Sequence, residues 1–327
     1  MQASFAQEFN ETAAAAYEAF PLELARLVVV VDKLVYISPE IAGQLTKNTS
    51  AIREALAKAT SERRTRNWQG IAWGDFDLAG TPVDLIALTN KNIGGTFSRL
   101  YTKKMAAIYN LDHEIGHHIV KGGMAYSEHL SENAADAYAM LRHIQRFGKN
   151  TGHAGNKGAD MASPLVLFAD TAHYTTNAIQ RAIEVADEKG EDFFTLSLRE
   201  TAELAAEIAD ECQLNRTTLK KLRKAFMPVA KYCKANIGDA GDINRKLYDE
   251  DKETYAAVCR KTISAMRKYQ GNPAVFKAGE HFLSQPKISS FMTEAAKTDS
   301  YWKNALAFLN RPKQSTLTRG APIVSTI

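Results

Sequence analysis

His113, Glu114 and His117 form an HExxH pattern, the feature of this sequence with the most specific chemistry. In a helix, residues four apart lie one above the other on the same face, so the two imidazoles can bind one zinc ion. Glu114 is turned by about 100° from His113 and is expected to reach the metal-bound water instead of the metal. Zinc lowers the pKa of that water to about 7, and a nearby carboxylate can take its proton. The pattern therefore predicts a zinc site with Glu114 as general base.

A zinc site with an open coordination position needs a third protein ligand. Val120 and Gly123 stand where the HExxHxxGxxH pattern requires glycine and histidine, so the metzincin arrangement is excluded. We expect the third ligand on the following helix, whose candidates are His129, Glu128, Glu132 and Asp136. Glu132 is chosen as the ligand, because Asp136 then lies on the same face and can accept the free ring N–H of a ligand histidine. His129 stays an alternative, since imidazole is an equally good zinc donor.

Both segments that carry these residues are predicted to be helices. Within residues 98–120, apolar residues recur at the spacing of an amphipathic helix, at Ile108, Leu111, Ile115 and Ile119. A second helix is predicted over residues 127–147. Its small residues would let it pack closely against the first helix, as a shared metal requires: Ala134, Ala135, Ala137 and Ala139.

The rest of the chain predicts an α-rich α+β fold. Residues 71–76 and 83–88 are apolar runs between glycines and predict two strands of a small sheet. Residues 22–37 could be a helix or a strand, and the glycine-rich stretch 149–164 is interpreted as a loop. Another helix is predicted over residues 49–64, and the chain after residue 164 is expected to be mainly helical.

We expect three parts in this fold. Residues 1–97 would hold N-terminal helices and the small sheet, residues 98–160 a zinc-binding helical core, and residues 161–327 a helical C-terminal region.

The segment of residues 98–147 resembles the gluzincin branch of zinc metallopeptidases, in which a helical HExxH precedes a glutamate ligand and an acidic residue on a downstream helix. The short interval between the two helices is similar to that of phage-repressor-cleaving peptidases and minigluzincins. The resemblance implies a zincin-like core and a substrate-binding edge strand before the motif helix, a place that residues 83–88 fit. It implies these roles: His113, His117 and Glu132 as Zn²⁺ ligands, Glu114 as the base and Asp136 as support for a ligand.

Such a site also needs a donor that stabilises the oxyanion beside the metal. The candidates are Tyr126, His153, His173 and Tyr174. His173 and Tyr174 are preferred as catalytic residues, because Asp170, three residues before His173 on a presumed helix, could orient the imidazole. An ordinary interhelical pair is the alternative for Asp170 and His173.

Composition predicts a soluble protein. The 327 residues carry a net charge of +4, with 45% hydrophobic and 24% charged residues. The first 11 residues contain no lysine or arginine, unlike a secretory signal, and the longest aliphatic run, residues 27–31, is too short for a membrane helix. Three cysteines without a CxxC pattern indicate reduced thiols. We therefore expect a cytoplasmic protein without a membrane partner; delivery into a host cell or by a phage is compatible with the sequence.

Charge is segregated in the C-terminal half of the chain. Residues 184–211 are mostly acidic, whereas residues 216–234 contain seven lysines and arginines and no acid. We interpret these runs as two antiparallel helices with complementary faces, since a short basic run is usually a solvated or salt-bridged face. The alternative is a nucleic-acid patch, but the net charge is too mild to imply one, and nucleic acid is not expected as a partner.

The sequence as a whole predicts a zinc-dependent endopeptidase with Zn²⁺ as cofactor and a protein or peptide as substrate. The alternative is a regulatory or toxin-like interaction protein with a structural or vestigial zinc site. Glu114 separates the two hypotheses, because a structural site has no need of a glutamate beside its first histidine.

Overall fold

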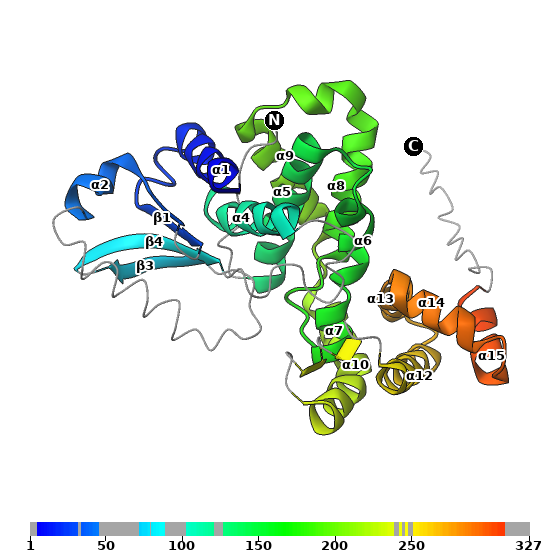
Figure 1. The fold of residues 1–327 in the computed structure, drawn as a ribbon. Coiled ribbons are helices and arrows are strands. Elements are labelled where there is room, and N and C mark those ends of the chain that lie inside the picture. Colours follow the sequence, from blue (N-terminus) through cyan, green and yellow to red (C-terminus); the bar gives the residue numbers. More distant parts are fainter. Residues whose placement is uncertain are drawn as a thin grey trace, which may run out of the picture.

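A computed structural model describes residues 5–31, 34–45, 72–78, 80–88, 103–120, 127–238, 242–243, 246–247 and 251–310. Figure 1 shows a small sheet at one end of the molecule and helices over the rest, which confirms an α-rich α+β fold. The helix predicted over residues 49–64 and the oxyanion candidate Tyr126 lie outside the described residues.

Four strands form one mixed sheet in the order β2-β1-β4-β3. The two predicted strands are confirmed as β3 (Ala72–Leu78) and β4 (Thr81–Leu88), which pair antiparallel and form a hairpin. The ambiguous apolar segment supplies the other two strands, β1 (Leu27–Val31) and β2 (Leu34–Ile37), and β1 runs parallel to β4. A run of valines favours this outcome, because β-branched side chains fit a pleated surface.

The expected position of residues 83–88 at a sheet edge is wrong. These residues belong to β4, which pairs with β1 on one side and β3 on the other, so its backbone groups are used within the sheet. Val83 to Leu88 are all buried, as an interior strand requires. The edges of the described sheet are β2 and β3.

Both faces of the sheet are covered by helices. Val28, Val30 and Leu85 pack with the short helix α2 (Pro39–Leu45). Val29 and Ile86, one residue further along their strands, point to the opposite face and join α1 (Phe5–Ala19) and α4 (Lys103–Ile119) in the first core. This alternation follows from the two-residue period of a strand.

Two long helices carry the predicted zinc residues. They are α4 and α5 (Glu128–Phe147), and α5 also packs against α8 (Thr176–Lys189) and α9 (Leu198–Cys212). The predicted apolar stripe of α4 is buried, at Ile108, Leu111, Ile115 and Ile119. A capping box is present at the start of α9, with Ser197 as N-cap and Glu200 as its partner.

The glycine-rich stretch interpreted as a loop is helical. It forms α6 (Gly152–Asp160) and the start of α7 (Ser163–Phe168). The Thr151 hydroxyl caps α6 by accepting a hydrogen bond from the Ala154 N–H. Gly158 has the side chains of α8 close to it, so packing against α8 outweighs the low helix propensity of glycine.

A second core lies in the C-terminal part of the chain. It joins α7 to α10 (Arg216–Asn236), α12 (Lys252–Lys268), α13 (Pro273–Leu283), α14 (Pro286–Ala295) and α15 (Ser300–Leu309). The three-part division predicted from the sequence stays a prediction. In the structure α8 and α9, which lie in its third part, contribute to the first core. None of the described helices is long and apolar enough to cross a membrane.

Candidate metal centre

The motif helix and the next helix touch through their smallest residues. A Cβ atom at Gly116 would lie 3.0 Å from the Cα of Ala135, closer than van der Waals contact allows without a shift. Ala134, Ala135 and Ala137 are fully buried. This contact sets the separation of α4 and α5, and it brings the carboxylate of Glu132 on α5 to the histidines of α4.

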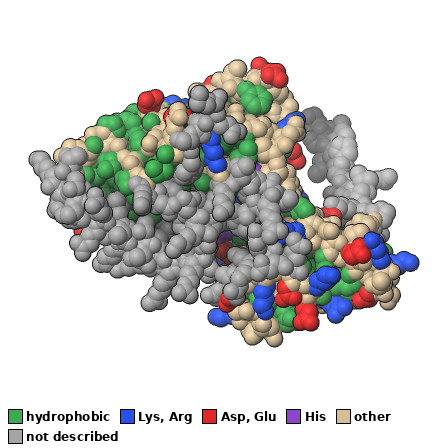
Figure 2. All heavy atoms as spheres, viewed as in Figure 1, with side chains coloured by type: hydrophobic (Ala, Val, Ile, Leu, Met, Phe, Trp, Pro, Cys, Tyr) green, Lys and Arg blue, Asp and Glu red, His purple; other side chains and the backbone are tan. Residues whose placement is uncertain are grey.

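His113, His117 and Glu132 come together as predicted. One ligand atom from each lies within 4.8 Å of the other two. Glu132 Oε2 is 3.4 Å from His113 Nε2, and Glu132 Oε1 is 3.8 Å from His117 Nε2. A small patch of histidine and acidic side chains is visible near the centre of the face drawn in Figure 2.

The distances and the donor set fit zinc. Nitrogen and oxygen ligands at about 2.0–2.1 Å from a tetrahedral ion are about 3.3 Å from each other. The His113–Glu132 separation of 3.4 Å matches this value, and the His117–Glu132 separation of 3.8 Å is longer. Glu132 Oε2 is also buried with no hydrogen-bond partner, a costly state for a carboxylate oxygen that a cation would relieve. The residues present therefore fit a bound Zn²⁺ ion.

Each histidine is oriented by its other ring nitrogen. His113 Nδ1 lies 2.9 Å from Asp136 Oδ1, and His117 Nδ1 lies 3.0 Å from the Ser131 hydroxyl. These contacts leave both Nε2 atoms directed at Glu132. Nε2 is the nitrogen that a metal needs when Nδ1 carries the proton.

Asp136 holds His113 in position, and the side chain of Asp136 is 1% exposed. Besides His113, it accepts hydrogen bonds from the Tyr109 hydroxyl at 2.9 Å and from the Thr175 hydroxyl at 2.5 Å. Burial raises the pKa of Asp136, but the charge and hydrogen bond of His113 outweigh it and hold the pKa well below its usual range. Asp136 is therefore a carboxylate held by three donors.

Glu114 follows His113 on α4 and is 7% exposed. Its action on a water molecule stays a prediction.

His173 reaches the same site from the segment between α7 and α8. Its Nε2 atom lies 3.6 Å from Glu132 Oε1, and its Nδ1 atom lies 2.7 Å from Asp170 Oδ2. The expected helix is absent at this point, because Asp170 instead closes a turn by accepting hydrogen bonds from the N–H groups of Ala172 and His173. Burial lowers the pKa of His173, but the hydrogen bond and charge of Asp170 and the charge of Glu132 outweigh burial and raise it to about 9.

The structure separates Tyr174 from His173. Tyr174 is buried in the second core, and its hydroxyl lies 3.5 Å from Nδ1 of His281 on α13. Neighbouring residues outside a helix can point in different directions, which spacing alone cannot predict. The sequence grouped these two residues as catalytic, whereas the structure brings only His173 to the triad.

The other candidates also lie outside the triad. His129 contacts the Ala172 carbonyl through Nδ1 at 3.4 Å and Asn133 through Nε2 at 3.3 Å. His153 is buried with its ring centroid 4.5 Å from that of Tyr109 and 4.6 Å from that of His143. Burial also lowers the pKa of His153.

Three supporting residues were missed by the sequence analysis. Tyr109 lies one helical turn before His113, so the i,i+4 spacing could have indicated it. Ser131 and Thr175 have no such signal, because their partners come from other helices.

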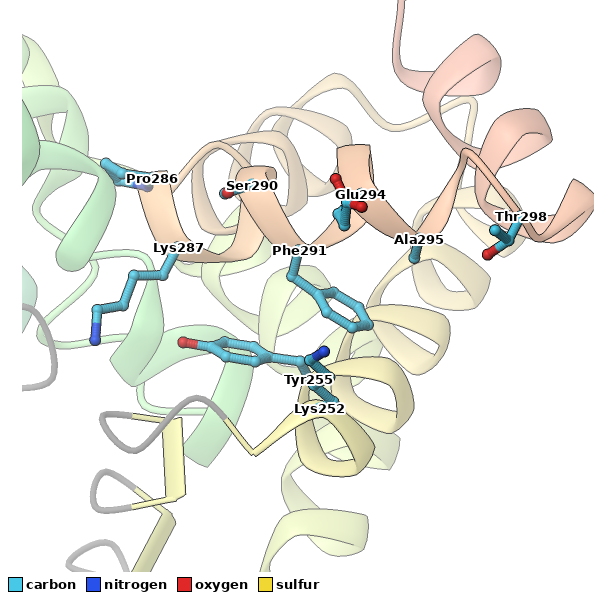
Figure 3. A pocket seen from close by; sticks show the side chains of 9 residues that line it. All are labelled: Lys252, Tyr255, Pro286, Lys287, Ser290, Phe291, Glu294, Ala295 and Thr298. Atoms are coloured by element: carbon cyan, nitrogen blue, oxygen red, sulfur yellow. The ribbon is translucent and has the colours of Figure 1, made fainter.

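A separate cavity of about 590 Å³ lies in the second core, between α12 and α14 (Figure 3). The rings of Tyr255 and Phe291 face each other there, with centroids 5.6 Å apart. No residue of the triad lines this cavity.

Comparison with known proteins returned no match to a family model, to a curated protein or to a solved structure. The gluzincin resemblance therefore depends on the motif residues and their geometry alone.

Proposed function

We propose that this protein is a zinc-dependent peptidase of gluzincin type. The observation that carries the proposal is the convergence of His113, His117 and Glu132, whose ligand atoms lie within 4.8 Å of one another. Zinc supplies Lewis-acid chemistry there and makes a water molecule acidic at neutral pH. The resemblance over residues 98–147 adds the expectation of peptide-bond hydrolysis.

In this proposal each residue of the site has its own role in the hydrolysis. Glu114, beside the first histidine, takes the proton of the attacking water and passes it to the leaving amine. His173, held by Asp170, would in its protonated form donate a hydrogen bond to the oxyanion that develops on the scissile carbonyl. Asp136 keeps His113 in the ligating tautomer. Tyr174 has no place in this scheme, because its hydroxyl lies against His281.

The substrate class is a protein or peptide, and we propose a cytoplasmic location. Cys212, Cys233 and Cys259 are all free thiols, and the latter two are buried. Free thiols are typical of a reducing compartment.

Cleavage of a native protein mixture tests the proposal. Wild-type protein and Glu114→Gln would each be incubated with the same lysate proteins, and newly formed N-termini would be identified by mass spectrometry. We expect new N-termini with the wild type that are missing with Glu114→Gln and with wild type treated with a chelator. A wild-type protein that holds stoichiometric zinc and creates no new N-termini would contradict the proposal.

A further inference from the structure

One helix of the second core carries a continuous basic stripe. At 100° per residue, six of the seven lysines and arginines of α10 fall within an arc of about 100°. The first and the last of them are 18 positions apart in the helix, so the stripe is about 27 Å long. All six are exposed: Arg216, Lys220, Arg223, Lys224, Lys231 and Lys234.

The opposite side of α10 anchors the helix. Five of its residues are buried in the second core, on an arc centred roughly 160° from the stripe: Leu222, Ala225, Phe226, Val229 and Cys233. The helix is thereby fixed with its basic side outward. Within the arc of the stripe, the half-buried Met227 is the one apolar residue beside the charges.

The acidic helix expected to neutralise this stripe lies elsewhere. α9 packs on α5 and α8, whereas α10 packs on α7, α12 and α13, so the predicted pairing of acidic and basic faces is wrong. Glu211 on α9 pairs with Arg181 of α8 instead. Within the described part of the chain, no carboxylate forms an ion pair with a lysine or arginine of α10.

The net charge also differs between the N-terminal and the C-terminal part of the chain. Residues 213–327 contain 21 lysines and arginines against 9 acidic residues, a net charge of +12. Residues 1–212 contain 20 against 28, a net charge of −8. The mild total of +4 therefore hides a strongly basic C-terminal part.

The neighbouring helix α12 also carries exposed lysines. α12 packs beside α10, and Lys261 of α12 lies 4.5 Å from the ring centroid of the half-buried Tyr232 of α10. Lys268 is exposed further along α12. Tyr232, and with it Lys261, lies about 130° around α10 from the centre of the stripe.

The residue composition of the stripe favours one class of anionic partner over the others. A membrane-surface helix must bury its apolar face in lipid, but the apolar face of α10 is already in the protein core. Protein interfaces favour aromatic anchors and are depleted of lysine, which supplies four of the six charges here. A row of lysines and arginines without apolar anchors suits the phosphates of a nucleic acid, whose neutralisation supplies sequence-independent affinity.

We propose that the exposed face of α10 binds the phosphate backbone of a nucleic acid. The contacts are electrostatic and independent of base sequence. The surface is separate from the metal triad, and the proposal is independent of the peptidase function.

Fluorescence anisotropy with labelled oligonucleotides tests the proposal. The full-length protein would be titrated with a 24-base-pair DNA duplex, a 24-base-pair RNA duplex and a 24-nucleotide single strand at several salt concentrations. We expect binding to at least one of them, and the tightest identifies the nucleic acid. The test variant replaces Lys220, Lys224 and Lys231 with Gln. It should bind at least tenfold more weakly, and the slope of log K against log salt should be shallower by about 3 for a duplex, close to one per lost phosphate contact.

The matched control replaces three exposed lysines outside α10, Lys189, Lys277 and Lys303, with Gln. It changes the net charge equally and should bind as the wild type does. Equal weakening in both variants would overturn the proposal, because it would show a general charge effect. Preferential binding to phosphatidylserine vesicles or to polyglutamate, with no binding to any oligonucleotide, would also overturn it.

Discussion

Gly116 and Ala135 lie so close that a Cβ atom on the glycine would be 3.0 Å from the alanine Cα. The glycine is inside the HExxH motif, and the alanine is three residues after Glu132. The backbone contact between these residues therefore fixes how near the carboxylate ligand comes to the two histidines.

Gly116→Ala should separate the helices and weaken the metal site. The obstructing atom belongs to the backbone and cannot rotate away, so we expect a loss of about 1–3 kcal/mol in the free energy of unfolding. Zinc affinity should fall at least tenfold, as measured by competition with a chelator. Gly155→Ala is the control, because a Cβ there meets nothing within 4 Å. Unchanged zinc affinity in Gly116→Ala would show that this contact does not set the geometry.

Asp136→Asn should weaken zinc binding by about 10–100-fold, because His113 loses the carboxylate that orients its ring. The measurement is the zinc dissociation constant at neutral pH. Asp187→Asn, which removes an exposed carboxylate paired with Lys149, should leave it unchanged. Equal zinc affinity in Asp136→Asn and wild type would contradict the role given to Asp136.

His173→Gln should lower kcat by about 10²–10³-fold and leave zinc bound, because it removes a charged donor to the oxyanion. Tyr174→Phe should have almost no effect on kcat, since the hydroxyl faces His281. Steady-state kinetics and zinc content on the same preparations separate the two residues. A large loss of kcat in Tyr174→Phe would restore the role predicted from the sequence.

His143 should make the fold sensitive to acid. Burial, together with the charge of Arg146, lowers the pKa of His143 to about 4. The unfolded chain therefore binds a proton near pH 6.5 that the folded protein takes up only near pH 4. The contribution of neutral His143 to the free energy of unfolding is fully present above about pH 6.5. It is lost as the pH falls, by about 2 kcal/mol between pH 7 and pH 5.

Urea unfolding at pH 7 and pH 5 measures this loss. His143→Gln should show a smaller difference between the two pH values than the wild type does. A difference as large as that of the wild type would assign the acid sensitivity to other groups.

Local spacing was sufficient to predict that His113, His117 and Glu132 come together. The i,i+4 relations of His113 with His117 and of Glu132 with Asp136 are properties of a single helix each, and the short interval between the helices brings them together. The hairpin of β3 and β4 is equally local. These parts of the structure follow from the sequence because their contacts are near in the chain.

Long-range contacts could not be predicted in this way. The insertion of β1 between β2 and β4 makes Val83 to Leu88 an interior strand, and periodicity carries no information on that pairing. The helix α6 forms because Gly158 packs against α8, against its own propensity. Likewise, the hydroxyl of Thr175 meets Asp136 only after α5 and α8 have packed.

The central claim is that Glu114 acts as a base beside a zinc ion held by His113, His117 and Glu132. The most direct test measures zinc content and peptide hydrolysis on the same preparations of wild type and Glu114→Gln. Glutamine keeps the shape of the side chain but cannot take a proton. We predict one zinc per chain in both proteins and a rate at least about 10²–10⁴-fold lower in the variant. Hydrolysis by Glu114→Gln at the wild-type rate would contradict the account.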